Sequence, residues 1–370
     1  RGLGDVYKRQ KLVNTNNFHY VGKVIKKIDS KPQKQLGIFR NTPNGPRVRS
    51  IDKSGQDWLV ELDESVAIGE GELVEVKKIY SGRRIRSDKV KISERLGDAS
   101  APRSISLIAI HQHNIPNTFP DEVILQSKKA TLVNNKKWHD YTEMPFVTID
   151  PKDARDHDDA CYAKLDDDPE NPGGHLLWVA IADVAHFVRS GDSIDNEARY
   201  RGNSTYFPDR VVPMLPDSLS GDLCSLHEGE KRACLVVKMK IDSQGNKLSH
   251  KFTRALIQSY ASLEYSEVQE AVDKGTGRQE VLQLLEQVLN PLYAAYNSLK
   301  VARNKRGPLE LNLPERQIDI DKTGKVTEIR FKERLDAHKL IEEFMILANV
   351  CAAETPVSYT HLTLPTILLV

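Results

Sequence analysis

Five aspartates lie within the short stretch TIDPKDARDHDDA, residues 148–160, and two apolar segments flank it. The segment MPFVTID leads into the stretch and predicts a buried strand, whereas HDDACYAKL leads out of it and predicts a second strand. Because a strand fixes where successive side chains point, we expect the aspartates to converge at the corner between the two strands. Two carboxylates about 4 Å apart repel by roughly 4 kcal/mol at an effective dielectric constant of about 20, so this corner requires cations or shifted pKa values.

A second acidic stretch, LDDDPENPGGH at residues 165–175, provides an internal comparison. It is rich in Pro and Gly and has no flanking apolar strand of the same kind, so we expect a solvated loop there. A calcium loop of the EF-hand type does not fit the first stretch, because Cys161 and Asp167 occupy the positions that require Gly and Glu when Asp156 is the first ligand. Magnesium is the natural cation, because it takes carboxylate oxygens and accepts substrate phosphate oxygens as further ligands.

The composition is that of a soluble protein of two or three domains, with 370 residues, 39% hydrophobic and 28% charged. Its four cysteines form no CxxC pair, so the sequence suggests neither a zinc site nor a disulfide partner and fits a reducing cytoplasm. The longest internal apolar run, LLWVAIADVAHFV, is interrupted by Asp183 and His186, and a membrane span requires about 20 apolar residues. We therefore expect a cytoplasmic protein without a membrane span.

Charge divides the chain into two opposed regions. Residues 11–100 contain 18 Lys and Arg against 12 Asp and Glu, whereas residues 141–200 contain 5 against 14. A basic region suits a polyanion, and an acidic region suits cations.

Within the basic region, five short β-rich runs are separated by turn residues: YVGKVIKKI, KQLGIFR, RVRSI, DWLVEL and ELVEVKKIY. They predict a small barrel of the oligonucleotide-binding type. The aromatic residues Phe39, Trp58 and Tyr80 either stack on the bases of a single strand or fill the barrel core, and the core is the favoured interpretation for each.

The sequences at the two ends of the chain do not resemble the sequence next to them, and the DNA that would encode them is related. Codons for DVYKRQ near the start, read on the opposite strand in a shifted frame, encode the VSYTH found near the end. This inverted repeat resembles a translated sequencing adapter. We therefore expect residues 1–10 and 357–370 not to be native, and the natural protein to continue past both ends.

The remaining segments indicate helices and a third strand. SISLIAIHQHN and PNTFPDEVILQSKKA predict linker helices, and the second of these starts near Pro120 and Asp121. HLLWVAIADVAHFV predicts a strand, and apolar residues three and four apart predict helices within residues 279–307 and 335–354.

The aspartate stretch resembles the catalytic signature of the ribonuclease II and ribonuclease R family of 3′-to-5′ exoribonucleases. The matching residues are Asp150, Pro151, Ala154, Arg155, Asp156, Asp158, Asp159 and Ala160. VAIADVAHFV, YFPDRVVPMLPDSLSGDLCSL, RGPLELNLPE and DAHKLIEEFMILAN resemble other family segments in the expected order, over roughly residues 17–355. The amino-acid sequences of the later segments favour the ribonuclease R branch.

The resemblance implies a multidomain fold, in which cold-shock β-barrels precede a mixed α/β (α+β) catalytic domain that is incomplete at its C-terminal end. The implied boundaries are 11–34 for the last strand of a first cold-shock domain, 35–100 for a second, 101–136 for linker helices and 137–356 for the catalytic domain.

The resemblance also implies roles for single residues. The aspartates that would bind two magnesium ions, with manganese as an alternative, and position the attacking water are Asp150, Asp156, Asp158 and Asp159. Tyr206 resembles an aromatic residue that stacks on the 3′-terminal nucleotide, and the alternative is a core residue. Glu343 resembles a carboxylate that contacts the sugar of that nucleotide, and the alternative is a solvated helix face.

Three positions are less informative or depart from the family pattern. Leu311 stands where many relatives carry an aromatic residue, which puts a two-sided clamp on the terminal base in doubt. His157 is interpreted as a non-ligand within the metal loop, and His186 as a core histidine.

Together these features predict a magnesium-dependent hydrolase that binds single-stranded RNA 3′ ends, shortens them and releases nucleoside 5′-monophosphates. The alternatives are an inactive RNA-binding protein of the same fold and a calcium-stabilised module, which the failed loop comparison disfavours. Because the resemblance stops near Thr355, inside the catalytic domain, we expect the 370-residue chain itself to be at most weakly active.

Overall fold

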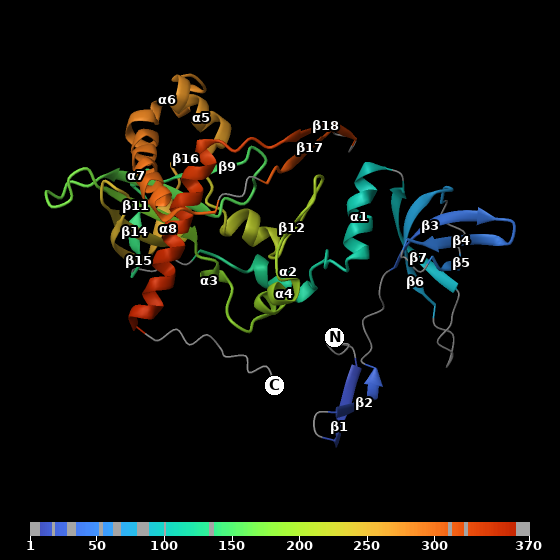
Figure 1. The fold of residues 1–370 in the computed structure, drawn as a ribbon. Helices are drawn as coiled ribbons and strands as arrows, with labels where there is room; N and C mark the ends of the chain where they lie inside the picture. Colours follow the sequence, from blue (N-terminus) through green and yellow to red (C-terminus); the bar gives the residue numbers. More distant parts are fainter. Residues whose placement is uncertain are drawn as a thin grey trace. The chain divides into compact units, whose positions relative to one another are not determined.

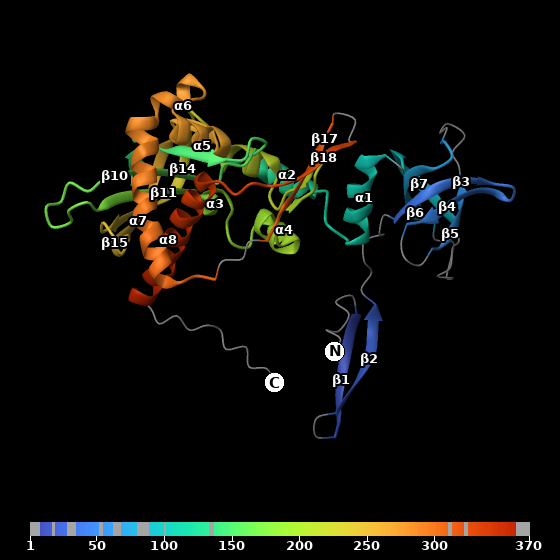
Figure 2. The same ribbon diagram turned by 45° about the horizontal axis from the view of Figure 1, so that its top comes forward.

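The computed structural model describes residues 8–16, 19–27, 35–51, 55–61, 68–79, 89–99, 101–132, 137–309, 313–321 and 325–359. The chain divides into two compact units (Figures 1 and 2). Unit 1 comprises Arg1–Asn117, Tyr206–Arg210 and Ile318–Ile329, and unit 2 comprises Thr118–Thr205, Val211–Gln317 and Arg330–Val370.

Unit 1 contains a closed five-stranded barrel with the strand order β3-β4-β5-β7-β6. Its strands are β3 (Gln35–Thr42), β4 (Gly45–Ser50), β5 (Asp57–Glu61), β6 (Glu72–Lys78) and β7 (Lys89–Asp98). A separate hairpin, β1 (Lys8–Asn16) with β2 (His19–Lys27), precedes the barrel, and helix α1 (Pro102–Gln112) follows it. The expected barrel is confirmed, but its fifth strand is β7, which none of the five predicted runs contains. The run YVGKVIKKI instead forms β2, so the region before the barrel holds two strands where one was expected.

The barrel is closed around alternating apolar residues. Phe39 and Trp58 are 2% and 3% exposed, and Val48, Val74 and Val90 pack with them. Both aromatic rings therefore belong to the core, as favoured from the sequence, and are not available for stacking on bases. Tyr80 lies outside the described residues.

Unit 2 is built on a seven-stranded mixed sheet with the order β16-β9-β10-β11-β14-β15-β8. Its strands are β8 (His139–Tyr141), β9 (Val147–Asp150), β10 (Asp159–Leu165), β11 (His175–Ala182), β14 (Lys231–Ile241), β15 (Lys247–Gln258) and β16 (Ala261–Glu264). The pairs from β9 to β15 are antiparallel, whereas β16 runs parallel to β9 and β8 runs parallel to β15. Elsewhere in the chain, two-stranded sheets pair β12 (Thr205–Tyr206) with β13 (Val211–Val212), and β17 (Arg316–Ile320) with β18 (Val326–Phe331).

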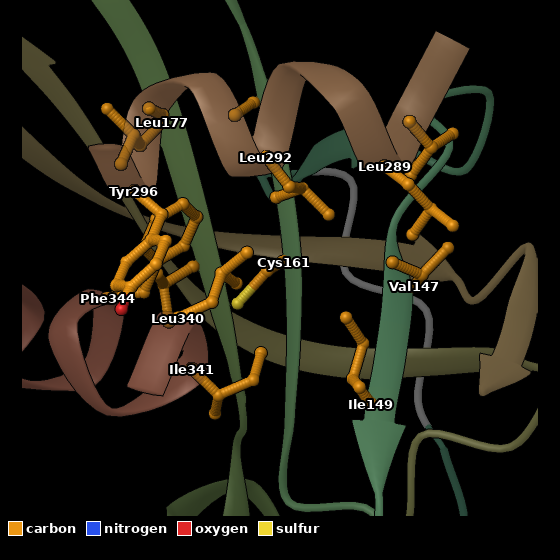
Figure 3. Close-up of a cluster of buried hydrophobic side chains, with 14 of the residues drawn as sticks. Val147, Ile149, Cys161, Leu177, Leu289, Leu292, Tyr296, Leu340, Ile341 and Phe344 are labelled. Atoms are coloured by element: carbon orange, nitrogen blue, oxygen red, sulfur yellow. The ribbon is translucent and has the colours of Figure 1, made fainter. Parts of the chain in front are cut away.

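Both faces of this sheet are covered. Alternate residues divide between two clusters, so that Cys161 and Leu177 face one side while Ala160 and Trp178 face the other. Figure 3 shows the first cluster, where apolar residues of α7 and α8 lie over the sheet. The helices of unit 2 are α2 (Asp121–Lys128), α3 (Val184–Phe187), α4 (Ser193–Arg201), α5 (Tyr265–Lys274), α6 (Gln279–Gln283), α7 (Asn290–Arg306) and α8 (Asp336–Tyr359), with π-helical turns η1 (Leu219–Leu223) and η2 (Leu285–Leu289).

The structure corrects two local predictions. The predicted third strand ends at Ala182, and the rest of its apolar run forms the short helix α3. The acidic stretch at residues 165–175 is only partly solvated, because the side chain of Asp166 is 7% exposed and pairs with Lys240 at 3.0 Å. By contrast, the side chain of Asp167 is 83% exposed.

No helix in the described part of the chain is long and apolar enough to cross a membrane.

Candidate active site

The four candidate aspartates lie at the corner where β9 ends and β10 begins. Asp150 is the last residue of β9 and Asp159 the first of β10, while Asp156 and Asp158 lie on the connection. Because β9 and β10 pair antiparallel, both ends of this connection meet at one edge of the sheet. The predicted strand-loop-strand corner is therefore present.

Electrostatic coupling shows that the carboxylates of this corner are close enough to repel each other. Burial, together with the negative charges of Asp150 and Asp158, raises the pKa of Asp159 from 3.8 to about 7. Asp158 keeps an exposed surface, yet partial desolvation raises its pKa, and the charges of Asp156 and Asp150 add to the effect. Negative charge at this corner is thus only partly compensated by the protein itself.

His157 partly compensates that charge. Its Nδ1 atom lies 2.7 Å from Oδ2 of Asp150. This hydrogen bond raises the pKa of His157 above its usual value, against the effect of burial, and the charges of Asp150, Asp156 and Asp158 contribute further. The sequence-based interpretation of His157 as a non-ligand stays a prediction, and the structure adds a contact between its ring and the carboxylate of Asp150. His186, interpreted as a core histidine, is half-buried, and its ring contacts the rings of Trp138 and Phe187.

The donor chemistry of the corner fits a hard divalent cation, because carboxylate oxygens are the ligands that Mg²⁺ and Mn²⁺ prefer. The raised pKa values of Asp158 and Asp159 point the same way, since a bound cation favours the ionised carboxylates. Within the ranges that the structure describes, no three His, Cys, Asp or Glu side chains already adopt a metal-binding arrangement. The corner therefore supplies suitable ligands, while a preformed cage is not seen.

The two candidate nucleotide-contacting residues have different surroundings. Tyr206 is 64% exposed on β12, so the alternative of a core residue is excluded. Glu343 on α8 is only 6% exposed, so the alternative of a solvated helix face is excluded as well. Leu311 lies outside the described residues.

Two arginines near the end of α7 hold Glu343, and the sequence analysis did not identify them. Nε of Arg303 lies 3.1 Å from one carboxylate oxygen of Glu343, and Nη2 of Arg306 lies 3.7 Å from the other. Burial raises the pKa of Glu343, although the two guanidinium groups act in the opposite direction. The carboxylate is thus held in a defined, largely water-free place.

Tyr265 is a second residue that sequence reasoning missed. It follows Glu264, which pairs with Asp150 in the parallel β16–β9 register, and its ring stacks on His338 with centroids 3.9 Å apart. Burial raises the pKa of the phenol, and the charges of Asp150 and Asp159 raise it further, so the hydroxyl remains protonated beside the aspartate corner. No local pattern could reveal this placement, because it depends on pairing between segments far apart in the chain.

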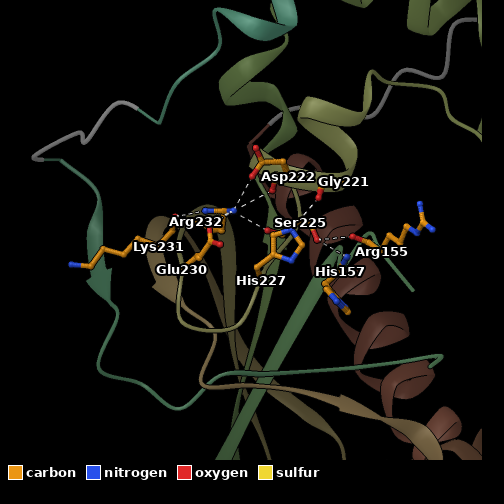
Figure 4. A network of polar contacts seen from close by, with 9 residues as sticks. All are labelled: Arg155, His157, Gly221, Asp222, Ser225, His227, Glu230, Lys231 and Arg232. Atoms are coloured by element: carbon orange, nitrogen blue, oxygen red, sulfur yellow. Dashed lines mark hydrogen bonds and ion pairs between the residues drawn. The ribbon is translucent and has the colours of Figure 1, made fainter. Parts of the chain in front are cut away.

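The backbone of the aspartate connection is bound to a polar network that extends from Gly221 to Arg232 (Figure 4). The buried side chain of Ser225 contacts the connection directly. The motif YFPDRVVPMLPDSLSGDLCSL contains Ser225, but its sequence alone does not show which segment this residue touches.

Comparison with known proteins identifies two domains. Residues 138–370 match the RNB domain, and residues 49–120 match a cold shock domain. Ribonuclease R of Vibrio parahaemolyticus is 36% identical over 355 residues, which cover 95% of this chain and 42% of that protein. Ribonuclease R of Escherichia coli is 37% identical over 301 residues, covering 80% of this chain and 36% of that protein.

Solved structures agree with the sequence comparison. The structure described as Mycoplasma genitalium RNase R in complex with ribose methylated single-stranded RNA has a TM-score of 0.76 and 25% identity. The match covers 95% of this chain and 56% of the Mycoplasma genitalium chain. The chain spans less than half the length of the two curated relatives named above. From the matched domains and these relatives, the chain belongs to the ribonuclease II and ribonuclease R family.

Proposed function

We propose that the protein is a magnesium-dependent 3′-to-5′ exoribonuclease that releases nucleoside 5′-monophosphates. The observation that carries the proposal is the aspartate corner, where four carboxylates at one strand junction of an RNB domain retain negative charge that the protein only partly compensates. A cation would relieve this repulsion and would provide a binding place for the phosphate of an RNA substrate.

The residues that would hold the cation are Asp150, Asp156, Asp158 and Asp159. When bound, magnesium supplies Lewis-acid stabilisation of phosphate oxygens and lowers the pKa of water. The carboxylates themselves orient the attacking water and accept its hydrogen bonds. His157 holds Asp150 through the 2.7 Å contact, so that this carboxylate keeps one direction.

Tyr206 and Glu343 would contact the 3′-terminal nucleotide. Tyr206 is 64% exposed, which is compatible with stacking on a base. Glu343 would accept a hydrogen bond from a ribose hydroxyl, and its ion pairs with Arg303 and Arg306 would fix the direction of that acceptor. Because the 2′-hydroxyl distinguishes RNA from DNA, this contact would favour RNA.

An RNA-binding protein of the same fold without activity is the alternative. The fold by itself does not distinguish the two, since a structure described as yeast Ssd1, a pseudonuclease, has a TM-score of 0.58 to this chain at 16% identity. The presence of all four family aspartates supports the enzyme.

The proposal is tested by digesting oligoribonucleotides that carry a label at either end, with Mg²⁺ or with EDTA. A 5′-labelled substrate is expected to yield a descending ladder, whereas a 3′-labelled substrate is expected to release labelled mononucleotide at once. The reaction is run with the 370-residue chain and with a form extended by the C-terminal portion of a ribonuclease R relative.

Comparing Asp158→Asn with Asp167→Asn distinguishes the loss of a candidate catalytic carboxylate from the loss of one negative charge elsewhere in the unit. Asp158→Asn is expected to lower hydrolysis at least about tenfold with little change in RNA affinity, because that affinity comes mainly from phosphate contacts to basic residues. Asp167→Asn removes an exposed carboxylate in the same unit and is expected to leave the rate unchanged. RNA binding without Mg²⁺-dependent release of mononucleotides by the extended form would support the inactive alternative instead.

A further inference from the structure

The hydroxyl of Ser225 bridges two neighbouring peptide groups of the aspartate connection. The backbone N–H of His157 donates to Oγ of Ser225 at 3.0 Å, and the same hydroxyl donates to the carbonyl oxygen of Arg155 at 3.2 Å (Figure 4). These two peptide groups lie on either side of Asp156. One side chain therefore fixes the backbone both before and after a candidate metal ligand.

The next two peptide groups are also held from outside the connection. The N–H of Leu226 donates to the carbonyl of His157 at 2.9 Å, and the N–H of Ala182 donates to the carbonyl of Asp158 at 3.0 Å. Each peptide link between residues 155 and 159 therefore makes a hydrogen bond to a partner elsewhere in unit 2. Three of these four bonds come from the adjacent residues Ser225 and Leu226.

Arg232 holds Ser225 in turn. Its Nε atom donates to the carbonyl oxygen of Ser225 at 2.9 Å, and its Nη2 atom lies 2.6 Å from Glu230 and 3.2 Å from Asp222. The guanidinium group is buried, with a side chain that is 8% exposed. Because charge-assisted hydrogen bonds are strong and directional, the segment that carries Ser225 has little freedom to shift.

We propose that Ser225 is a positioning residue, whose hydroxyl sets the direction of the Asp156 carboxylate for cation binding, and that Arg232 holds it in place. The inference rests on the proposed function, because the cation is the one that RNA hydrolysis would require. Ser225 itself is not a ligand in this proposal and acts only through the backbone of the connection.

The chemistry of the site suits this role. A serine hydroxyl can donate one hydrogen bond and accept another at the same time, as it does here between Arg155 and His157. Ser225 is 0% exposed, so water cannot readily replace the hydroxyl. Removing it would leave the partly buried N–H of His157 and C=O of Arg155 without this partner, and the connection would move to satisfy them.

The test measures Mn²⁺ binding to the 370-residue chain by electron paramagnetic resonance, together with the melting temperature in EDTA. Ser225→Ala is expected to weaken Mn²⁺ binding about 10- to 100-fold, the usual effect of removing a group that orients metal ligands. The matched control is Ser259→Ala, because Ser259 is 1% exposed and its hydroxyl donates to the carbonyl of Ala261 instead of the aspartate connection. The control is expected to lower the melting temperature to a similar degree while leaving Mn²⁺ affinity unchanged.

A purely structural role predicts a different result, in which both serine variants lose stability and neither loses Mn²⁺ affinity. That result would overturn the inference while leaving the proposed function intact. If Ser225→Ala does not fold, Ser225→Cys fills the same space with a weaker hydrogen-bonding group, and unchanged Mn²⁺ affinity in that variant would equally overturn the inference. Absence of Mn²⁺ binding in the 370-residue chain, together with absence of RNA hydrolysis by its extended form, would overturn the proposed function itself.

Discussion

Asp159→Asn is expected to stabilise the metal-free protein, although it removes a candidate catalytic carboxylate. The side chain of Asp159 is partly buried, and its pKa is raised from 3.8 to about 7 by desolvation and then by Asp150 and Asp158. Ionising Asp159 in the folded state is therefore unfavourable. Asparagine has nearly the same shape and carries no charge, so it avoids this penalty at every pH.

The sign of the effect follows from proton linkage. Between pH 3.8 and about 7 the unfolded chain ionises Asp159 while the folded protein keeps it protonated, so the free energy of unfolding falls as pH rises. Above about pH 7 Asp159 is ionised in both states, so the free energy of unfolding falls no further on its account. A shift from 3.8 to about 7 corresponds to about 4 kcal/mol, because each pKa unit is worth about 1.36 kcal/mol. Asp159→Asn should therefore match the parent near about pH 4 and exceed its stability by up to about 4 kcal/mol near about pH 8.

The assay is urea denaturation in EDTA across this pH range, followed by tryptophan fluorescence. Both proteins carry Trp58→Phe, so that Trp138 and Trp178 report unfolding of unit 2, which contains the aspartate corner. Asp167→Asn serves as the control, because the side chain of Asp167 is 83% exposed and its replacement should change stability by less than about 0.5 kcal/mol. The reasoning would be refuted if Asp159→Asn were no more stable than the parent near about pH 8. It would also be refuted if the variant were more stable by the same amount near about pH 4 and near about pH 8.

Four further predictions use other parts of the structure. Tyr206→Ala is expected to weaken RNA binding by roughly 1–3 kcal/mol and to change the length of the final undegraded product; unchanged affinity and ladder would remove Tyr206 from the substrate site. Phe344→Ala should lower the free energy of unfolding by about 3–5 kcal/mol in denaturant titrations, because its ring, on the buried face of α8, is fully buried. Mg²⁺ affinity measured by calorimetry should rise from about pH 6 to about pH 8, because a cation binds the ionised form of Asp159, whose pKa is about 7; a flat profile would exclude Asp159 as a ligand. Extending the chain with the C-terminal portion of a ribonuclease R relative should improve solubility and Mg²⁺-dependent RNA hydrolysis, because Ile346 and Val350 of α8 are 45% and 40% exposed; equal behaviour of both forms would show that the catalytic set is already complete.

Local patterns in the sequence determined the elements that carry the chemistry. The β-branched run before Asp150 and the apolar run after Asp159 predicted two strands with acidic residues between them, and both strands are present. Short β-rich runs separated by turn residues in the basic region likewise predicted a barrel, with the core as the favoured place for Phe39 and Trp58, and both lie there. Such features depend on neighbours within a few residues, whose periodicity decides which side of a strand or helix is buried.

Only the tertiary structure decided what surrounds the aspartates. Ser225 reaches His157 across 68 residues of sequence, and Arg303 meets Glu343 only because α7 and α8 pack on the same face of the sheet. The parallel pairing of β16 with β9 brings Tyr265 beside Asp150 in the same way. Hydrophobic periodicity shows which face of an element is buried but does not show which distant element covers it, so these partners become identifiable only when the sheet order is known.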